Sequence, residues 1–344
     1  MRKVTITDIA NELGCSPSTV SRALRNKEKV SAETYAAVSK LAKKYGYRPN
    51  PNATGLVNNR TRLLGVVVQH LEHSYFVKVL EGILATCQAK DYQVITCISH
   101  GSYEKEKQLL SQLYNQCVDG ILASHSHETK NFSHFQEIID ASIPMVFFDR
   151  FIEEIDTQCV ISDDFDGAKE AVEYLISNGR RKIAHLMGPE HLSVSYYRYL
   201  GYREALKEAG LPHDQDLVYV MLDEHGKDIA NKELFLQKIL EIDAVITFND
   251  SSAFEVYKLV RQMGRSIPED VAVIGFSDDP IAQYLTPQLT TVRQPAFKIG
   301  QRAAEVLIHK IERNQEEEIF PSSLPQETAS TIVLKNDLII REST

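Results

Sequence analysis

The sequence predicts a small all-α helix-turn-helix segment joined to a larger α/β body. Residues 1–62 hold 12 Lys and Arg against four Asp and Glu, a balance of +8, and because the whole chain carries −9, residues 63–344 carry −17. Helix-capping residues recur within the first 48 positions. Beyond them, Val- and Ile-rich runs alternate with amphipathic stretches, which is typical of parallel sheets covered by helices on both faces. A basic segment on an acidic body favours a polyanionic partner for that segment, although an uneven surface charge would give the same balance.

Composition argues against several classes of protein. The chain is 43% hydrophobic and 25% charged, which is ordinary for soluble globular proteins. No apolar run approaches the ~18 residues of a membrane-spanning helix, so we expect no membrane partner. The basic start lacks the apolar region of a signal peptide, which predicts a cytoplasmic protein. The five cysteines are never spaced as CxxC, which predicts free thiols without disulfides or a zinc site.

Capping signals predict three short helices in the first 48 residues. Thr5 opens a capping-box pattern for a helix over 6–13. Ser16 is the expected cap of a second helix that runs to about residue 24. A third helix is predicted over 31–45. Two helices joined by a turn of three or four residues form a helix-turn-helix, whose second helix enters the major groove of DNA.

The second helix has one apolar and one polar face. Val20 and Ala23 are expected to point into the small core. The residues left for DNA are Pro17, Ser18, Ser21 and Arg22. The Arg22 guanidinium matches the O6/N7 edge of guanine, although a solvated surface arginine is an equally common role for one such residue.

The run from residue 5 to residue 50 strongly resembles the headpiece of the Lac-repressor/galactose-repressor (LacI) family. The blocks STVSRAL, VSAET and GYRPN stand in the order and spacing of that family. The resemblance implies that Pro17, Ser18 and Arg22 read bases. It places the other headpiece contacts to DNA at Thr5, Ile6, Ser16, Thr19 and Ser21.

Residues 49–61 form a weak helix by composition. Gly55 alone costs about 1 kcal/mol relative to Ala, and so short a segment should not be helical in isolation. The resemblance implies a hinge helix that folds only on operator DNA, with Leu56 wedged into the minor groove and further contacts at Asn50 and Ala53. A plain flexible linker is the alternative.

The body contains eight strand candidates and six helical patterns. The strand candidates are LLGVVV (63–68), YQVIT (92–96), GILA (120–123), PMVFF (144–148), CVIS (159–162), KIAHLM (182–187), AVITF (244–248) and VAVIGF (271–276). The helical patterns are 75–89, 103–116, 164–178, 196–209, 231–240 and 253–263. No GxGxxG or GxxxxGK[ST] motif follows a strand, so no nucleotide cofactor is expected.

The resemblance continues through the body in VFFDR (146–150), RYLGYREAL (198–206), VITFNDSSA (245–253) and LTTVRQP (289–295). It implies the periplasmic-binding-protein fold, with two Rossmann-like subdomains and crossovers near 161, 292 and 321. The implied domains are a headpiece (1–48), a hinge (49–61) and a body (62–344), whose N-subdomain is 62–161 plus 293–321 and whose C-subdomain is 162–292 plus 322–344.

Ligands of open α/β sheets sit beyond the carboxyl ends of the strands, which selects the candidate residues. Strand ends and the segments after them supply His70, His73, Ser74, Tyr75, Phe76, Asp149, Arg150, Asp164, Asn249 and Asp250. The resemblance adds Arg198 and Ser277, and Ser193 and Ser195 are candidates beside Arg198. The resemblance makes Arg198 the strongest of them. Asp149 and Arg150 could instead form a structural ion pair, Asp250 could cap a helix, and the two serines could lie in a surface loop. Ser277 stands where relatives often carry a sugar-binding aspartate, which weakens the case for a free hexose but leaves a sugar or sugar derivative as the expected ligand.

These features predict a transcriptional regulator, most simply a repressor, that binds a pseudo-palindromic operator as a homodimer under control of a small-molecule effector. The end of the chain has no leucine heptad, which favours a dimer over a tetramer. No HExxH or GxSxG motif supports an enzyme, and the basic headpiece argues against a solute-binding protein for transport. The sequence leaves induction and corepression as equal alternatives.

Overall fold

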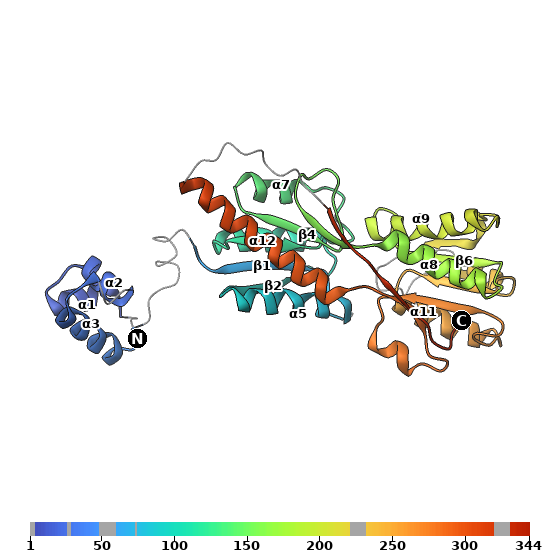
Figure 1. The fold of residues 1–344 in the computed structure, drawn as a ribbon, viewed down its shortest axis with the longest axis horizontal. Coiled ribbons are helices and arrows are strands. Elements are labelled where there is room, and N and C mark those ends of the chain that lie inside the picture. The colour runs from blue at the N-terminus through green and yellow to red at the C-terminus, as the bar shows by residue number, and fades with distance from the viewer. Residues whose placement is uncertain (1–3, 26–28, 48–59, 73, 221–231, 320–330) are drawn as a thin grey trace. The chain divides into compact units, whose positions relative to one another are not determined.

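The computed structural model of the protein describes residues 4–25, 29–47, 60–72, 74–220, 232–319 and 331–344 (Figure 1). The chain divides into two compact units, Met1–Thr61 and Arg62–Thr344. The division falls where the balance of charge along the sequence changes sign. Each unit is described by itself.

In its described residues, the first unit contains three α-helices, α1 (Ile6–Leu13), α2 (Pro17–Arg25) and α3 (Ala32–Lys44). The reciprocal capping box at the start of α1 is present, because the Thr5 hydroxyl accepts a hydrogen bond from the Asp8 amide while the Asp8 carboxylate accepts one from the Thr5 amide. The buried core consists of Ile9, Ala10, Val20, Ala23, Val38 and Ala42. The predicted helices and the inward positions of α2 are therefore confirmed.

The second unit is built on two six-stranded sheets. The first has the order β11-β5-β4-β3-β1-β2 and is parallel throughout its described pairings. Its strands are β1 (Leu63–Val68), β2 (Gln93–Ile98), β3 (Gly120–Ala123), β4 (Met145–Phe148), β5 (Cys159–Ser162) and β11 (Thr331–Leu334). Its helices are α5 (Ser74–Ala89), α6 (Tyr103–Asn115), α7 (Ser133–Asp140) and α12 (Ala296–Ile319).

The second sheet has the order β12-β10-β9-β8-β6-β7, with only the β10–β12 pair antiparallel among its described pairings. Its strands are β6 (Ile183–Met187), β7 (Val218–Val220), β8 (Ala244–Thr247), β9 (Ala272–Phe276), β10 (Thr290–Arg293) and β12 (Asp337–Ile339). Its helices are α8 (Asp164–Ser177), α9 (Ser193–Glu208), α10 (Lys232–Lys238) and α11 (Asp250–Gln262), with short 3₁₀ turns η2 (Gln215–Leu217) and η3 (Pro280–Tyr284).

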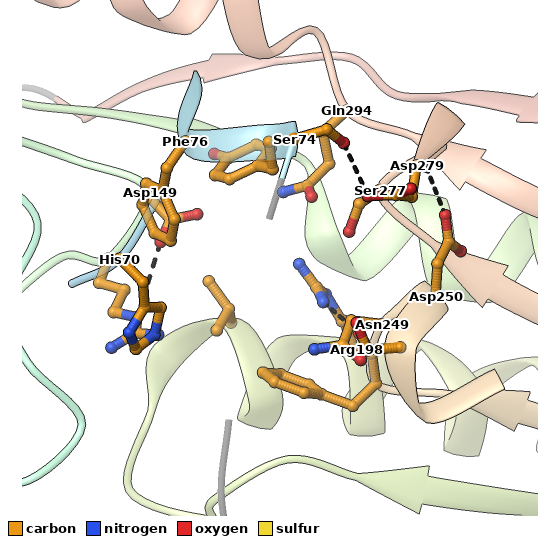
Figure 2. Close-up of a pocket in the computed structure, with 15 residues that line it drawn as sticks. His70, Ser74, Phe76, Asp149, Arg198, Asn249, Asp250, Ser277, Asp279 and Gln294 are labelled. Atoms are coloured by element: carbon orange, nitrogen blue, oxygen red, sulfur yellow. Dashed lines mark hydrogen bonds and ion pairs between the residues drawn. The ribbon is translucent and has the colours of Figure 1, made fainter. Parts of the chain in front are cut away.

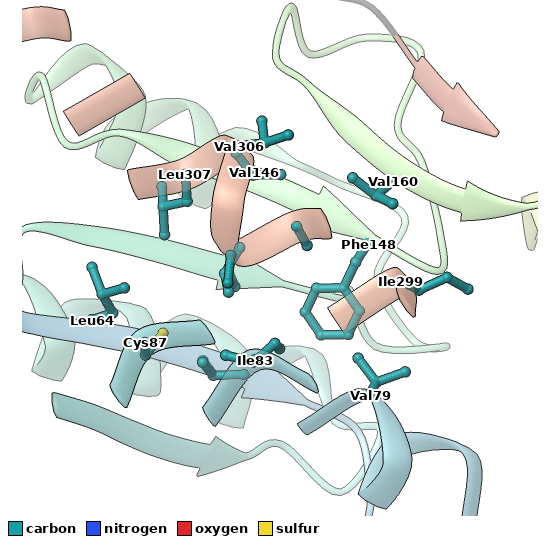
Figure 3. Close-up of a cluster of buried hydrophobic side chains, with 14 of the residues drawn as sticks. Leu64, Val79, Ile83, Cys87, Val146, Phe148, Val160, Ile299, Val306 and Leu307 are labelled. Carbon is teal, nitrogen blue, oxygen red and sulfur yellow. The ribbon is translucent and has the colours of Figure 1, made fainter. Parts of the chain in front are cut away.

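Helices cover both faces of each sheet, so each lobe has two buried cores. On one face of the first sheet, α5 and α12 pack against Leu64, Val146 and Phe148 (Figure 3). These two helices approach so closely that a Cβ on Gly300 would lie 1.9 Å from the Val79 carbonyl oxygen. All eight predicted strands are present, and parallel sheets buried on both faces are confirmed.

The third crossover between the lobes differs from the prediction. The chain leaves the first sheet after β5 and the second after β10, within a few residues of the expected 161 and 292. β11 (Thr331–Leu334) still pairs with β5, so the last crossing falls between β11 and β12 and not at 321. The prediction was wrong here because the short run TIVL of β11 was not included among the strand candidates. In the structure it is an edge strand whose positions are exposed or half-buried.

None of the five cysteines, all of which lie in the described residues, is joined in a disulfide. None of the described helices combines the length and apolar character needed to cross a membrane.

Candidate functional site

The outer face of α2 presents hydroxyl groups and one guanidinium. Ser16, at the start of this helix, accepts a hydrogen bond from the Thr19 amide at 3.2 Å, and its hydroxyl lies 2.7 Å from that of Ser18. Arg22 is exposed, and its Nε donates to the Ser18 carbonyl at 3.3 Å. Because α2 carries no acidic side chain, this face suits contact with phosphates and base edges.

The other residues expected to contact DNA differ in their exposure, and some lie outside the described residues. Pro17 is exposed and Ser21 is half-buried, both on α2, while Ile6 is half-buried at the start of α1. The Thr5 hydroxyl donates to Asp8 at 2.7 Å, so its proton is already used within the cap. Asn50, Ala53 and Leu56, with the rest of the expected hinge up to residue 59, lie outside the described residues.

A cavity of about 600 Å³, open to solvent, lies between the two sheets of the body (Figure 2). It is formed at the carboxyl ends of β1, β4, β8, β9 and β10 and by the first turns of α5, α9 and α11. Its lining consists of His70, Ser74, Tyr75, Phe76, Asp149, Arg150, Val194, Arg198, Phe248, Asn249, Asp250, Ser251, Ser277, Asp279 and Gln294. We call it the inner cavity.

Arg198 is the most fully engaged cation of the inner cavity. It is only 5% exposed, and its Nε lies 2.9 Å from the Asp164 carboxylate, while Nη1 donates to the Phe248 carbonyl at 2.5 Å. The guanidinium carbon lies 3.7 Å from the centroid of the Phe276 ring. These contacts fix the orientation of the guanidinium before any ligand arrives.

Asp164 does not line the cavity but supports it from behind. Burial raises the pKa of Asp164 to about 6, against the opposing effect of Arg198. Ser162 donates to Asp164 at 3.4 Å and accepts from the Gln294 side chain at 2.9 Å. A chain of polar contacts therefore joins Gln294, which lines the cavity, to Arg198.

Asp149 lies on the opposite wall with Tyr75 and Arg150. Its backbone has φ +66°, a left-handed conformation that is unusual outside glycine and often found at functional positions. Burial raises the pKa of Asp149, while Arg150, 3.6 Å away, lowers it. The Arg150 Nη1 also donates to the His125 carbonyl at 2.9 Å. The ion pair expected as an alternative exists, and both of its residues still line the cavity.

Asp250 ties three segments of the second lobe together. Its carboxylate accepts hydrogen bonds from the Thr291 hydroxyl and the Asp279 amide, both at 2.6 Å. Burial raises the pKa of Asp250 to about 6. The helix cap proposed as its alternative role belongs to Asn249, whose side chain accepts from the Ser252 amide at 2.9 Å.

The turn after β9 brings a third carboxylate, that of Asp279, into the cavity. Ser277 has φ +119°, and its hydroxyl donates to the carbonyl of the preceding residue. Asp279 accepts a hydrogen bond from Ser74 of the first lobe at 3.0 Å. Lys78, also in the first lobe, donates to the Asp278 carbonyl at 3.4 Å. The two lobes therefore touch directly beside the cavity.

The structure brings together most of the expected residues, with four exceptions. Asp164 supports the inner cavity without lining it. Ser193 lines a different cavity, described below, and Ser195 is fully buried in the first turn of α9. His73 lies outside the described residues. The sequence prediction also missed five lining residues: Val194, Phe248, Ser251, Asp279 and Gln294. Phe248, Asp279 and Gln294 each follow a strand closely, so the rule of strand ends could have found them.

The inner cavity combines donors, acceptors and aromatic faces. Arginine and asparagine side chains can donate hydrogen bonds, carboxylates can accept them, and Phe76 and Phe248 offer apolar faces. In the described part of the chain, no group of three or more His, Cys, Asp or Glu side chains could hold a metal ion. The cavity is therefore suited to a polyhydroxylated small molecule.

Comparison with known proteins assigns relatives to both units. The family model described as bacterial regulatory proteins, lacI family, matches residues 5–50, and a periplasmic binding protein-like domain matches residues 172–344. Over 338 residues the chain is 31% identical to the HTH-type transcriptional repressor PurR of Vibrio atlanticus (strain LGP32), covering 95% of this chain and 99% of the relative.

Two solved structures with similar folds hold sugars. The transcriptional regulator CelR–cellobiose complex is 28% identical with a TM-score of 0.74, covering 99% of this chain and 100% of the other. A periplasmic binding protein/LacI transcriptional regulator from Alkaliphilus metalliredigens QYMF, complexed with D-xylulofuranose, is 26% identical with a TM-score of 0.68, covering 82% of this chain and 99% of the other.

Proposed function

The chain belongs to the lacI family of bacterial regulatory proteins, and we propose that it represses transcription as a dimer on a pseudo-palindromic operator, under control of a sugar or sugar derivative bound in the inner cavity. Membership of the family and the fold of both units confirm the resemblance seen in the sequence. The chain is thus a DNA-binding transcriptional regulator with a helix-turn-helix. The relatives reported above are regulators or binding proteins, and none is named as an enzyme.

The ligand class rests on the opposed charged groups of the inner cavity. A sugar hydroxyl both donates and accepts hydrogen bonds, so it needs carboxylates and guanidinium groups within reach of one another. Arg198 and Asp149 provide these from opposite lobes, and both are held by other contacts. The two similar structures that hold sugars support the same class.

Asp279 is the acceptor that we assign to the sugar in place of Ser277. The Ser277 hydroxyl is occupied by a backbone carbonyl, whereas the Asp279 carboxylate lines the cavity and is held in place by Ser74 and by the amide of Ile281. A carboxylate accepts stronger hydrogen bonds than a hydroxyl does. Asp279, two residues after Ser277 in the same turn, would thus accept the hydrogen bond from a sugar hydroxyl that was expected at position 277.

Dimerisation is supported by apolar side chains exposed on the body. Ile281 and Tyr284 of η3 are 54% and 79% exposed, and Val77 and Leu84 of α5 are also exposed. Lys78 contacts the residue that precedes η3 by two positions, so these two elements are neighbours. Exposed apolar groups on adjacent elements are typical of a protein interface.

The proposal is tested by two variants that should separate its two halves. Operator sequences would first be selected from random DNA. Fluorescence anisotropy would then measure the affinity of the protein for them, with and without sugars that raise the melting temperature of the protein. Arg22→Ala should relax the base preference at one position of each half-site by about 1–3 kcal/mol and leave sugar binding intact.

Asp279→Asn, which keeps a side chain able to cap η3, should bind operator normally and lose the response to sugar. The sign of the sugar's effect on operator affinity distinguishes induction from corepression. Sugar binding that leaves operator affinity unchanged would refute the allosteric part of the proposal.

A further inference from the structure

We infer that the ligand consists of two linked sugar units without charge, of which one occupies the inner cavity and the other a second cavity beside it. This inference rests on the proposed function. The second cavity has a volume of about 630 Å³, which includes space open to solvent. Its walls come from both lobes, namely the segments after β3 and β4 and the start of α9. We call it the outer cavity.

The two cavities share one wall. Arg150 lines the inner cavity and Phe151 the outer one, and the same alternation recurs between Val194 and Ser193. On the next turn of α9, Arg198 lines the inner cavity while its neighbour Tyr197 lines the outer one. Consecutive residues on two segments, the turn after β4 and the start of α9, therefore face one cavity each, which places the outer cavity next to the inner one.

The outer cavity has an aromatic wall that suits a sugar ring. Phe151 and Tyr197 come from different lobes, and their ring centroids lie 5.8 Å apart at an interplanar angle of 42°. Tyr196 adds an edge contact to Tyr197, with centroids 5.6 Å apart. The apolar face of a pyranose stacks on such rings, while its hydroxyls remain in contact with water at the open side.

The start of α9 provides unused hydrogen-bond donors on the same wall. The Ser193 hydroxyl is buried and has no hydrogen-bond partner among the described residues. Leu192, the capping residue, cannot satisfy the first amides of the helix with its side chain. A hydroxyl group of a second sugar unit would accept hydrogen bonds from the first backbone amides of α9 or from the Ser193 hydroxyl, which would then have a hydrogen-bond partner.

Charge determines which kind of second unit fits. Glu153, Glu154 and Glu190 line the outer cavity, and all three are exposed. None of the described residues that line it is Lys or Arg. Carboxylates accept hydrogen bonds from neutral hydroxyls but repel a phosphate or a uronate. The outer cavity therefore selects an uncharged sugar unit over a sugar phosphate.

The experiment compares disaccharides with the single units that they contain. Differential scanning fluorimetry of the full chain would screen cellobiose, maltose, lactose and trehalose together with D-glucose, D-galactose, their methyl glycosides and D-glucose 6-phosphate. Calorimetry would then measure the best disaccharide and its matching methyl glycoside on four variants, Tyr197→Ala, Tyr197→Phe, Ser193→Ala and Asp279→Asn. Tyr114→Ala on α6 is the control, because Tyr114 is 49% exposed and lines neither cavity.

We expect the disaccharide to bind at least about tenfold more tightly than the methyl glycoside, a difference of about 1.4 kcal/mol. Tyr197→Ala should remove most of that advantage and leave methyl glycoside affinity within about twofold, whereas Tyr197→Phe should retain it. Ser193→Ala should weaken the disaccharide selectively, and Asp279→Asn should weaken both ligands.

Three results would overturn the inference in distinguishable ways. If the methyl glycoside binds as tightly as every disaccharide and Tyr197→Ala is silent, the outer cavity holds no sugar while the proposed function stands. If only D-glucose 6-phosphate binds, the uncharged two-unit ligand is wrong while a sugar derivative stands as the ligand class. If no sugar binds at all, both the inference and the proposed ligand class are wrong.

Discussion

The buried ion pair between Arg198 and Asp164 predicts an unequal response to the removal of each partner. The two side chains are 5% and 6% exposed, and Nε lies 2.9 Å from the carboxylate oxygen. Arg198→Met leaves the carboxylate buried without its counterion, which should lower the free energy of unfolding by about 3–5 kcal/mol at pH 8. Adding Asp164→Asn replaces the pair by two neutral side chains and should recover most of that loss.

The destabilisation by Arg198→Met should also depend on pH. In the unaltered protein, burial raises the pKa of Asp164 to about 6, and Arg198 is the group that most lowers it. Without Arg198 the folded-state pKa rises further above the ordinary value of 3.8, so the folded state binds this proton more tightly than the unfolded state does.

Stability contributed by that proton is present at low pH and falls as pH rises toward the folded-state pKa. In the unaltered protein this contribution to the free energy of unfolding stops falling near pH 6, which is the folded-state pKa of Asp164. In Arg198→Met it continues to fall above pH 6. The difference in free energy of unfolding between the unaltered protein and Arg198→Met should therefore be smallest at pH 5. Above pH 6 it should grow by about 1.4 kcal/mol per pH unit.

Urea unfolding followed by circular dichroism at pH 5, 6, 7 and 8 measures these differences. The Phe248 carbonyl loses its donor in the single and the double variant alike, so that loss cancels when the two are compared. If Arg198→Met and the double variant were equally stable at every pH, the assignment of an uncompensated buried charge would be refuted.

Three other substitutions test separate parts of the body. Glu106→Gln should cost about 1–3 kcal/mol at pH 7, because the buried carboxylate accepts from His134 (2.9 Å), Thr129 (2.7 Å) and the Ser126 amide (2.5 Å). Burial opposes ionisation, but these hydrogen bonds lower the pKa of Glu106 below 4.5, so the difference from the parent should shrink as pH falls through that pKa in acid unfolding. Gly300→Ala should lower the free energy of unfolding by about 1–3 kcal/mol in urea titrations, because its Cβ would meet backbone of α5. Tyr284→Lys should shift sedimentation toward monomer and weaken operator binding without lowering the melting temperature of the monomeric body; an unchanged dimer would exclude η3 from the interface.

The buried parts of the fold are those that the sequence predicts best. Each of the eight predicted strands is apolar at most positions because its sheet is covered on both faces. Four strands were missed: β7, β10, β11 and β12. β7, β11 and β12 have only three or four residues with partly exposed positions. β10 is buried at three of its four positions, but its sequence TTVR has only one apolar residue. The prediction also omits α12, although Ile299, Ala303, Leu307 and Ile311 are buried at a spacing of four.

The candidate site was predictable in its location and not in its internal contacts. The rule of strand ends selects His70, Asp149 and Asn249 correctly as lining residues. It cannot distinguish Asp250, whose oxygens are engaged by Thr291 and a backbone amide, from a carboxylate available to a ligand. That distinction depends on which strands are neighbours in the sheet, and strand order is set by packing across the whole lobe.

The contacts between the lobes explain how a ligand could alter the body as a whole. Ser74 donates to the Asp279 carboxylate across the cleft, and Lys78 donates to the backbone carbonyl of Asp278. Both donors lie in the first two turns of α5. A sugar hydroxyl that donates to Asp279 would share this carboxylate with Ser74, so we expect ligand binding and the contact between the lobes to be thermodynamically linked. α5 and α12 are in close backbone contact, because the backbone of α12 lies against Gly82 and the backbone of α5 lies against Gly300. A change at the start of α5 is therefore transmitted to both helices of this face and not absorbed within one of them.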